Sequence, residues 1–167
     1  MGKISNQFVL KKLSDRFGEK ISDLSEPYGL LTFETTAEEI INILSFLKED
    51  AELKFIFLTD ITAVHYPGQD LAIAVVYHIH SFVNNVRVRI KVFVSETNPV
   101  IPTATTLWEG ANWMERETYD FFGVQFLGHP NLVRILNVDD MTAFPMRKEF
   151  PLEDPNRVDK KDFFFGR

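Results

Sequence analysis

The chain has 167 residues and a formal net charge of −6 at pH 7, a length typical of one domain that buries its own core. Its 45% hydrophobic and 25% charged residues are typical of a globular protein and argue against a disordered chain. The acidic balance disfavours nucleic acid as a partner, because phosphates are neutralised by clustered Lys and Arg, and the absence of Cys excludes a disulfide, a thiolate-bound zinc ion and an ordinary iron–sulfur cluster.

The first part of the chain predicts a helix, a strand and a second helix. An amphipathic segment runs from Ser5, which we expect to be the N-cap, to Gly18, where the helix should stop. Residues 28–33 (YGLLTF) form a compact apolar run after a proline and predict a strand. Thr36 and Glu39 have the spacing of a capping box, so the second helix should begin there.

Three strand-like runs follow, at residues 54–66, 71–80 and 86–94. The turn formers Pro67-Gly68 and Asn84-Asn85 join them and predict an antiparallel meander. The third run alternates Val or Ile with mostly charged residues, which predicts one buried and one largely solvated face. The first two runs are apolar on both faces, as central strands tend to be.

A Pro- and Thr-rich segment separates these strands from a third helix, which we expect to begin at Thr103 or Thr106 and to end at Gly123. After Gly123, repeated prolines disfavour long helices and central strands. We therefore predict an α+β fold, with a mostly antiparallel sheet and flanking helices in residues 1–123. An extended, Pro-rich C-terminal arm, residues 124–167, should follow and needs a surface to lie on.

The third helix mixes charged and aromatic residues in the stretch WMERETYDFFGVQF. At 100° per residue, Thr118 and Phe122 face the sheet, Trp113 and Asp120 face away, and Glu115 lies near the core face. A helix that is apolar on several sides is usually buried on several sides, so the arm, another subunit or both should cover the outer face. A carboxylate near the core needs partners or a shifted pKa. The arm supplies three candidate cations: Arg134, Arg147 and Lys148.

No catalytic or metal site is recognisable. The glycines are scattered, so there is no phosphate loop, and neither a GxSxG nor a HExxH motif occurs. His78 and His80 share one face of a strand. A hairpin turn at Pro67-Gly68 would leave His65 roughly 20 Å from His78, at about 3.3 Å per residue, so we predict that these histidines form no metal site.

A basic stripe of Arg87, Arg89 and Lys91 along the third strand leaves one rival function open. Such a stripe suits a free-standing nucleic-acid-binding module, but that module would also need exposed aromatic residues on the same face, and only Phe93 is available there. A solvated strand face paired with neighbouring acids is the interpretation that we favour.

Residues 112–136, NWMERETYDFFGVQFLGHPNLVRIL, resemble the signature of the C-subunit family of respiratory complex I, the proton-pumping NADH:quinone oxidoreductase. Five further segments resemble that family's recurring segments in the same order: LTDITAVHYPG, VVYHIHS, RVRIKVFV, TLWEGANW and FPMRKEFPL. The chain departs from the family pattern at Val133, Ala143, Met146 and Glu149, where Arg, Gly, Leu and Asp are usual.

The resemblance implies a structural subunit of an enzyme complex, with no catalytic, cofactor-binding or metal site on this chain. NADH, FMN, iron–sulfur clusters and quinone would be held by other subunits. The chief partner would be the quinone-site D subunit, with the B subunit and other peripheral-arm subunits beside it, at the cytoplasmic face of the inner membrane and with neither a membrane span nor bound nucleic acid. The alternative within the same resemblance is a homologous subunit of a membrane-bound hydrogenase or a ferredoxin-linked complex.

The resemblance also marks structural and interface residues on the third helix and the arm: Trp113, Glu115, Arg116, Glu117, Tyr119, Asp120, Phe122, Gly123, His129, Pro130, Arg134, Pro145, Arg147, Lys148 and Pro151. We hypothesise that the four charged residues of the helix form a partly buried ion network with the three cations of the arm and fix the arm to the helix. The terminal DFFFGR, residues 162–167, is expected to lie against the D subunit.

Overall fold

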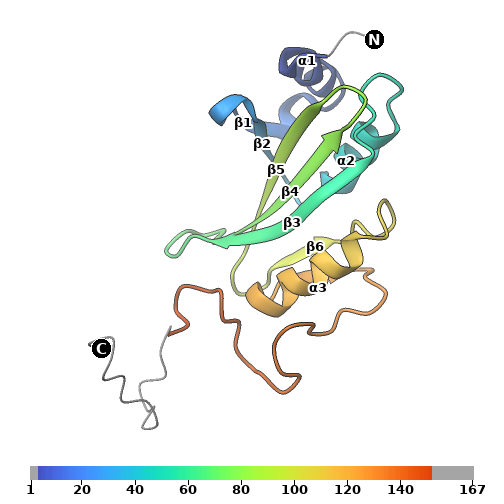
Figure 1. Cartoon of the computed structure of the whole chain (residues 1–167). Coiled ribbons are helices and arrows are strands. Elements are labelled where there is room, and N and C mark those ends of the chain that lie inside the picture. The colour runs from blue at the N-terminus through green and yellow to red at the C-terminus, as the bar shows by residue number, and fades with distance from the viewer. Residues whose placement is uncertain (1–3, 152–167) are drawn as a thin grey trace, which may run out of the picture.

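A five-stranded sheet in the order β1-β2-β5-β4-β3 forms the centre of the computed structural model, which describes residues 4–151 (Figure 1). The strands are β1 (Ile21–Ser25), β2 (Leu31–Thr35), β3 (Phe57–His65), β4 (Ile73–Ser81) and β5 (Val86–Val94). Only β2 and β5 pair in parallel, and the other neighbours are antiparallel. The predicted α+β fold, the mostly antiparallel sheet and the meander of three strands are therefore confirmed.

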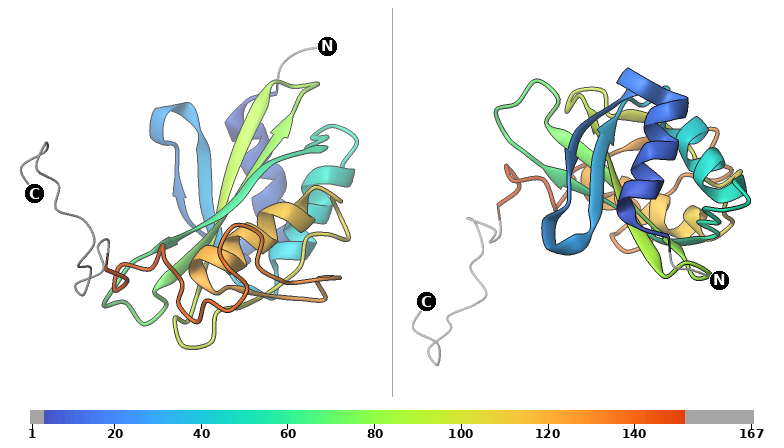
Figure 2. Two further views of the ribbon diagram at one scale, coloured as in Figure 1. Left: turned by 60° about the horizontal axis from the view of Figure 1, so that its bottom comes forward. Right: turned by 90° about the horizontal axis from the view of Figure 1, so that it is seen from above.

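Helices α1 (Asn6–Phe17) and α2 (Ile40–Glu49) pack on the sheet and on each other (Figures 1 and 2). The predicted ends of α1 are confirmed, since the Ser5 hydroxyl accepts a hydrogen bond from the Phe8 N–H at 3.2 Å and Gly18 ends the helix with a φ of +52°. Two short 3₁₀ helices, η1 (Gly18–Lys20) and η2 (Pro27–Gly29), flank β1. Strand β1 itself was not predicted.

The predicted starts of the second and third helices were wrong. Helix α2 begins at Ile40, because the Glu39 carboxylate pairs with Lys20 at 2.6 Å instead of reaching back to Thr36 as a capping box requires. Helix α3 (Ala111–Phe122) begins after Gly110, and the chain from Thr103 to this point consists of loop and turns. Strands β1 and β2 both precede α2, where one strand was predicted between the first two helices.

The expectation that the first two strands of the meander are central is correct for β4 and wrong for β3, which lies at the sheet edge. The prediction that β3 is apolar on both faces is wrong as well. Ile61, Ala63 and His65 are buried, whereas Asp60, Thr62 and Val64, which alternate with them, are half-buried or exposed, and α3 packs along the strand (Figure 1). Strand β5 has the predicted two faces: Val88, Ile90 and Val92 are fully buried, whereas the basic residues between them are exposed or half-buried. None of the helices within residues 4–151 is long and apolar enough to cross a membrane.

A second, two-stranded sheet pairs β6 (Val100–Pro102) in parallel with β7 (Gln125–Leu127) and was not predicted. It brings the segment that precedes α3 beside the segment that follows it. Val124 and Phe126 are buried in the main core, so the extended part of the arm begins after β7. The predicted domain boundary after Gly123 stays a prediction. We use "the arm" below for residues 128–151.

Candidate functional site

Helix α3 is covered on two sides. On the inner side, the Thr118 hydroxyl donates to the Ile61 carbonyl of β3 at 3.1 Å, and Phe122 joins the core. On the outer side, the arm runs along the helix (Figure 2) and buries Asp120 completely. Trp113 stays 63% exposed. The expectation that the chain's own arm covers the outer face is thus correct for the C-terminal half of the helix.

The carboxylate of Glu115 is fully buried, and no cation of residues 4–151 pairs with it. It accepts hydrogen bonds from the Thr103 hydroxyl at 2.5 Å and from the Ala104 N–H at 2.6 Å. Burial raises its pKa to about 7, and the two hydrogen bonds oppose that rise. The predicted pairing of Glu115 with the cations of the arm is wrong, because the β6–β7 pair holds the Thr103 segment against the helix instead.

Asp120 and Arg134 form the central contact between α3 and the arm. Their side chains meet at 2.6 Å and are 0% and 7% exposed. Asp120 Oδ2 also accepts the backbone N–H groups of three consecutive arm residues, Ile135, Leu136 and Asn137, at 3.1, 2.8 and 2.9 Å. Burial alone would raise the pKa of Asp120, but these N–H donors and the guanidinium outweigh it and hold the pKa far below its ordinary value.

Arg134 also closes a loop within the arm. Its guanidinium donates to the carbonyls of Met141 at 2.5 Å and Ala143 at 3.0 Å, and it lies 5.3 Å from the centre of the Phe144 ring. Ala143 has no positive φ, so replacing the family's usual Gly requires no strained backbone there. One Arg side chain thus bridges the end of α3 and two turns of the arm.

Phe144 fixes the arm against the end of α3. The guanidinium groups of Arg134 and Arg147 lie 5.3 and 4.9 Å from the centre of its ring, which packs edge-on against Tyr119. The predicted stop of α3 at Gly123 is confirmed, with a φ of +80°. A Cβ at Gly123 would lie 2.6 Å from the Phe144 ring, so Gly is needed both for the turn and for this contact.

Most of the hypothesised ion network is absent from residues 4–151, where Asp120–Arg134 is its one ion pair. Arg116 donates to the carbonyls of Val133 and Arg134, and Arg147 donates to that of Phe122. Glu117 is exposed. The physical reason is that an irregular arm leaves many carbonyls without partners in a sheet or helix, and the arginines satisfy them.

The remaining marked residues lie along the same contact. His129 Nδ1 accepts the Asn131 N–H at 3.0 Å, and its Nε2 lies 3.2 Å from the Asn112 carbonyl oxygen. Pro130 is exposed, Pro145 is half-buried, and Pro151 is exposed at the end of the described chain. The terminal DFFFGR lies outside the described residues.

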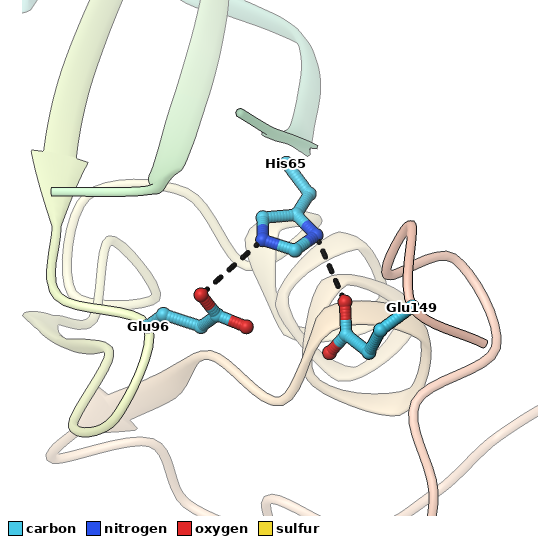
Figure 3. Close-up of side chains that lie close together, drawn as sticks. All are labelled: His65, Glu96 and Glu149. Atoms are coloured by element: carbon cyan, nitrogen blue, oxygen red, sulfur yellow. Dashed lines mark ion pairs between the residues drawn. The ribbon is translucent and has the colours of Figure 1, made fainter. Parts of the chain in front are cut away.

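One cluster was not predicted. His65, at the end of β3, is buried between the carboxylates of Glu96 and Glu149, with its Nε2 3.5 Å from the former and its Nδ1 3.3 Å from the latter (Figure 3). His78 faces Asp60, at the other end of the β3–β4 pair from His65, so the histidines do not come together. No catalytic or metal-binding motif marks Glu96 or Glu149, because they reach His65 from loops.

The three groups of this cluster offer ligand atoms within 4.8 Å of one another, but their arrangement does not suit a metal ion. The two carboxylates approach different ring nitrogens, whereas one ion can bind only one of them. Nδ1 already accepts the Lys148 N–H at 3.0 Å, which in a neutral ring leaves the proton on Nε2 and blocks that nitrogen as a ligand.

Apolar side chains remain exposed on the outer side of α3, at the end of β7 and along the arm. They are Trp113, Leu127, Val133, Leu136, Val138 and Met146, each at least 45% exposed. Leu136 and Val138 are 64% and 67% exposed, on either side of Asn137, whose backbone N–H and side chain both bind Asp120. The Asp120 contacts therefore hold these two side chains outward on a fixed backbone.

Comparison with protein families matches residues 33–156 to the model of respiratory-chain NADH dehydrogenase, 30 Kd subunit. The NADH-quinone oxidoreductase C subunit of Citrifermentans bemidjiense is 45% identical over 152 residues, which are 91% of this chain and 93% of that protein. The corresponding C subunit of Geobacter sulfurreducens is 41% identical, over 91% of this chain and 93% of that protein.

Two solved structures are similar to this fold. The trypsin-resistant fragment (1-134) of Nqo5 matches with a TM-score of 0.65 and 30% identity, over 75% of this chain and 98% of the fragment. A chain of the membrane-bound sulfane sulfur reductase, an archaeal respiratory membrane complex, matches with a TM-score of 0.74 and 25% identity, over 87% of this chain and 85% of that chain.

Proposed function

The chain belongs to the 30-kDa subunit family of respiratory-chain NADH dehydrogenase, and from this we propose that it is a structural subunit of the peripheral arm of a proton-translocating NADH:quinone oxidoreductase. Its task is to dock and stabilise the quinone-site D subunit. The B subunit and other peripheral-arm subunits are its further neighbours, and the assembly lies at the cytoplasmic face of the inner membrane.

The observation that carries this proposal is the presence of several exposed apolar side chains on a firmly held arm. Exposed apolar side chains that gather on one surface commonly mark protein–protein contacts. Here Leu136 and Val138 stand on a backbone that Asp120 holds with three N–H bonds. The surface is therefore already ordered, and this chain would lose little conformational entropy when a partner binds to it.

We further propose that the chain holds no redox cofactor and catalyses no step. The sequence offers no thiolate for an iron–sulfur cluster. The two buried carboxylates are fully used by neighbouring donors, Glu115 by the Thr103 segment and Asp120 by the arm. NADH, FMN, iron–sulfur clusters and quinone then belong to other subunits.

The similarity to a chain of the sulfane sulfur reductase complex supports a second candidate within the same class. In it, the chain would serve a membrane-bound hydrogenase or ferredoxin-linked complex. The basic stripe on β5 gives little support to a nucleic-acid-binding module, because Arg89 donates to the Thr32 hydroxyl and Lys91 lies 3.9 Å from Glu34.

The deciding experiment is a pull-down of the tagged full chain from detergent-solubilised membranes, with mass spectrometry of the captured proteins. We expect the quinone-site subunit, and flavin- and NADH-binding subunits in the same complex. Capture with hydrogenase or ferredoxin-linked subunits would favour the second candidate, and capture of nucleic acid without membrane subunits would contradict both.

A pair of variants tests the surface itself. Leu136→Ser should reduce the recovery of the partner subunits several-fold, because it removes an exposed apolar contact from the arm. Leu24→Ser is the matched control, since Leu24 is a leucine of similar exposure, 47%, on the edge strand β1. Equal recovery with both variants would show that the arm does not carry the interface.

A further inference from the structure

The His65 ring connects three segments that are far apart in the sequence. It stands at the end of β3, its side chain is 2% exposed, and it faces Glu96, from the chain between β5 and β6, and Glu149, from the arm (Figure 3). Among residues 4–151, no Lys or Arg lies within ion-pair distance of either carboxylate. Among these residues, the His65 imidazole is therefore the group that can place a positive charge beside the two carboxylates.

The Nδ1 atom of His65 has two neighbours that require opposite protonation states. The Lys148 backbone N–H points at it from 3.0 Å and needs a lone pair to accept it. The Glu149 carboxylate lies 3.3 Å away and needs an N–H to bind. A neutral ring satisfies the first neighbour and a protonated ring satisfies the second.

The Nε2 atom is buried and makes no hydrogen bond to any of the described residues. With Nδ1 accepting the Lys148 N–H, Nε2 carries the proton and points toward Glu96, whose Oε2 is 3.5 Å away. A small movement of Glu96, which is 38% exposed, would close this distance. Once the ring is a cation, each of its two N–H groups thus faces a carboxylate that can accept it.

We propose that His65 is a proton-operated clasp between the sheet and the arm. In the neutral state, the ring holds the arm by its backbone at Lys148. When a proton from solvent binds Nδ1, the ring releases the Lys148 N–H and binds the carboxylates of Glu149 and Glu96 as an imidazolium. The clasp changes from a backbone contact to two ion pairs, and the arm changes its attachment at residues 148–149.

The charged groups around the ring favour this exchange. Glu96 and Glu149 are the two carboxylates that face the ring, and two anions stabilise the imidazolium. Lys148 presents its backbone to the ring, and the guanidinium of Arg147 is turned to Phe144 and the Phe122 carbonyl. On β4 the residue opposite His65 is Ile73, which carries no charge.

The test is ¹⁵N NMR of the histidine rings in the full chain between pH 5 and 8, because ring ¹⁵N shifts distinguish the two neutral tautomers and the cation. We expect the neutral His65 ring to carry its proton on Nε2. We also expect the Lys148 amide shift to change with the same midpoint as the ring. A neutral ring with its proton on Nδ1, or a Lys148 amide that does not respond, would overturn the clasp.

Glu149→Gln and Glu96→Gln provide the matched variants, since both side chains are partly exposed and neither belongs to the core. Each removes the carboxylate that faces one nitrogen of the protonated ring, so the ¹⁵N shift of that nitrogen at pH 5 should differ from its value in the natural chain. His129 is the internal reference: its Nδ1 accepts the Asn131 N–H, but its Nε2 faces the Asn112 carbonyl and not a carboxylate. Its ring ¹⁵N shifts should stay unchanged in both variants, and an equal change at both histidines, or at neither, would contradict the proposal.

The alternative to the clasp is a metal ion bound by the three residues of this cluster. The same NMR sample tests for it. Addition of one equivalent of Zn²⁺ at pH 7.5 should leave the His65 ring signals in place. A stoichiometric Zn²⁺ complex that shifts Nε2 and is lost in Glu96→Gln would replace the clasp with a metal site.

Discussion

Asp120 Oδ1 lies 2.6 Å from Arg134 Nη1, and both side chains are withdrawn from solvent. This ion pair joins the last turn of α3 to the middle of the arm, across 14 positions of sequence. Three backbone N–H groups and the Asn137 amide complete the set of donors around the carboxylate. The charge is therefore buried without being left unsatisfied, which is the condition under which burial of an ion is tolerated.

Replacement of Asp120 by Ala should destabilise the chain by about 3–5 kcal/mol, because it leaves the Arg134 guanidinium buried without its counter-ion. Chemical denaturation of the full chain measures this change. Glu117→Ala, on the exposed side of the same helix, is the control and should change stability by no more than about 0.5 kcal/mol. A similar effect of both variants would contradict the stabilising role given to the ion pair.

The same carboxylate should make stability depend on acid pH. Its pKa is lowered in the folded state, so the stabilisation is complete above the unfolded value of about 3.9 and is lost as pH falls below it toward the folded value. Asp120→Asn removes this contribution, so the stability difference between the natural chain and the variant should shrink from pH 6 to pH 3. Urea titrations at the two pH values check this, and a constant difference would contradict it.

Gly123→Ala should destabilise the chain by about 1–3 kcal/mol. The residue has a φ of +80°, and the new Cβ would lie 2.6 Å from the Phe144 ring. Gly110→Ala is the matched control at the other end of α3, because its φ is −63° and a Cβ there meets nothing within 4 Å. Thermal unfolding of the two variants should separate them by several degrees, and equal melting temperatures would show that the arm yields to the added methyl group.

The elements that sequence patterns predicted are those whose signals are local. Ser5 and Gly18 bound α1 through contacts within four residues, and the turn formers at Pro67-Gly68 and Asn84-Asn85 bring consecutive strands together. The missed β6–β7 pair has three residues in each strand and spans the whole of α3. Such short strands have no periodicity of their own, and their pairing depends on where the helix ends.

The charged residues of the site divide in the same way. The inward position of Glu115 followed from helical spacing, but its partners did not, because a threonine hydroxyl and a backbone N–H leave no charge pattern in a sequence. Arg116 and Arg147 were expected to bind acids and bind carbonyls instead. The number of free carbonyls in an irregular arm depends on its course, which residue patterns do not specify.

Glu115 provides the opposite pH dependence to Asp120. Its pKa is raised to about 7 in the folded state from 4.5, so the folded chain binds the proton more tightly than the unfolded chain. The proton's stabilising effect is therefore complete below about pH 4.5 and is lost as pH rises to about 7, at a cost of roughly 3 kcal/mol.

Glu115→Gln should thus be more stable than the natural chain at pH 8 and close to it at pH 5, because Gln can accept the Ala104 N–H while its amide donates to Thr103 Oγ1. Urea titrations at both pH values measure the difference in stability. Glu115→Ala loses both hydrogen bonds and should lower the yield of assembled complex. Comparison of the Ala and Gln variants separates the loss of charge from the loss of contacts. A Gln variant less stable than the natural chain at pH 8 would show that the buried group is an ionised carboxylate whose two donors compensate its desolvation.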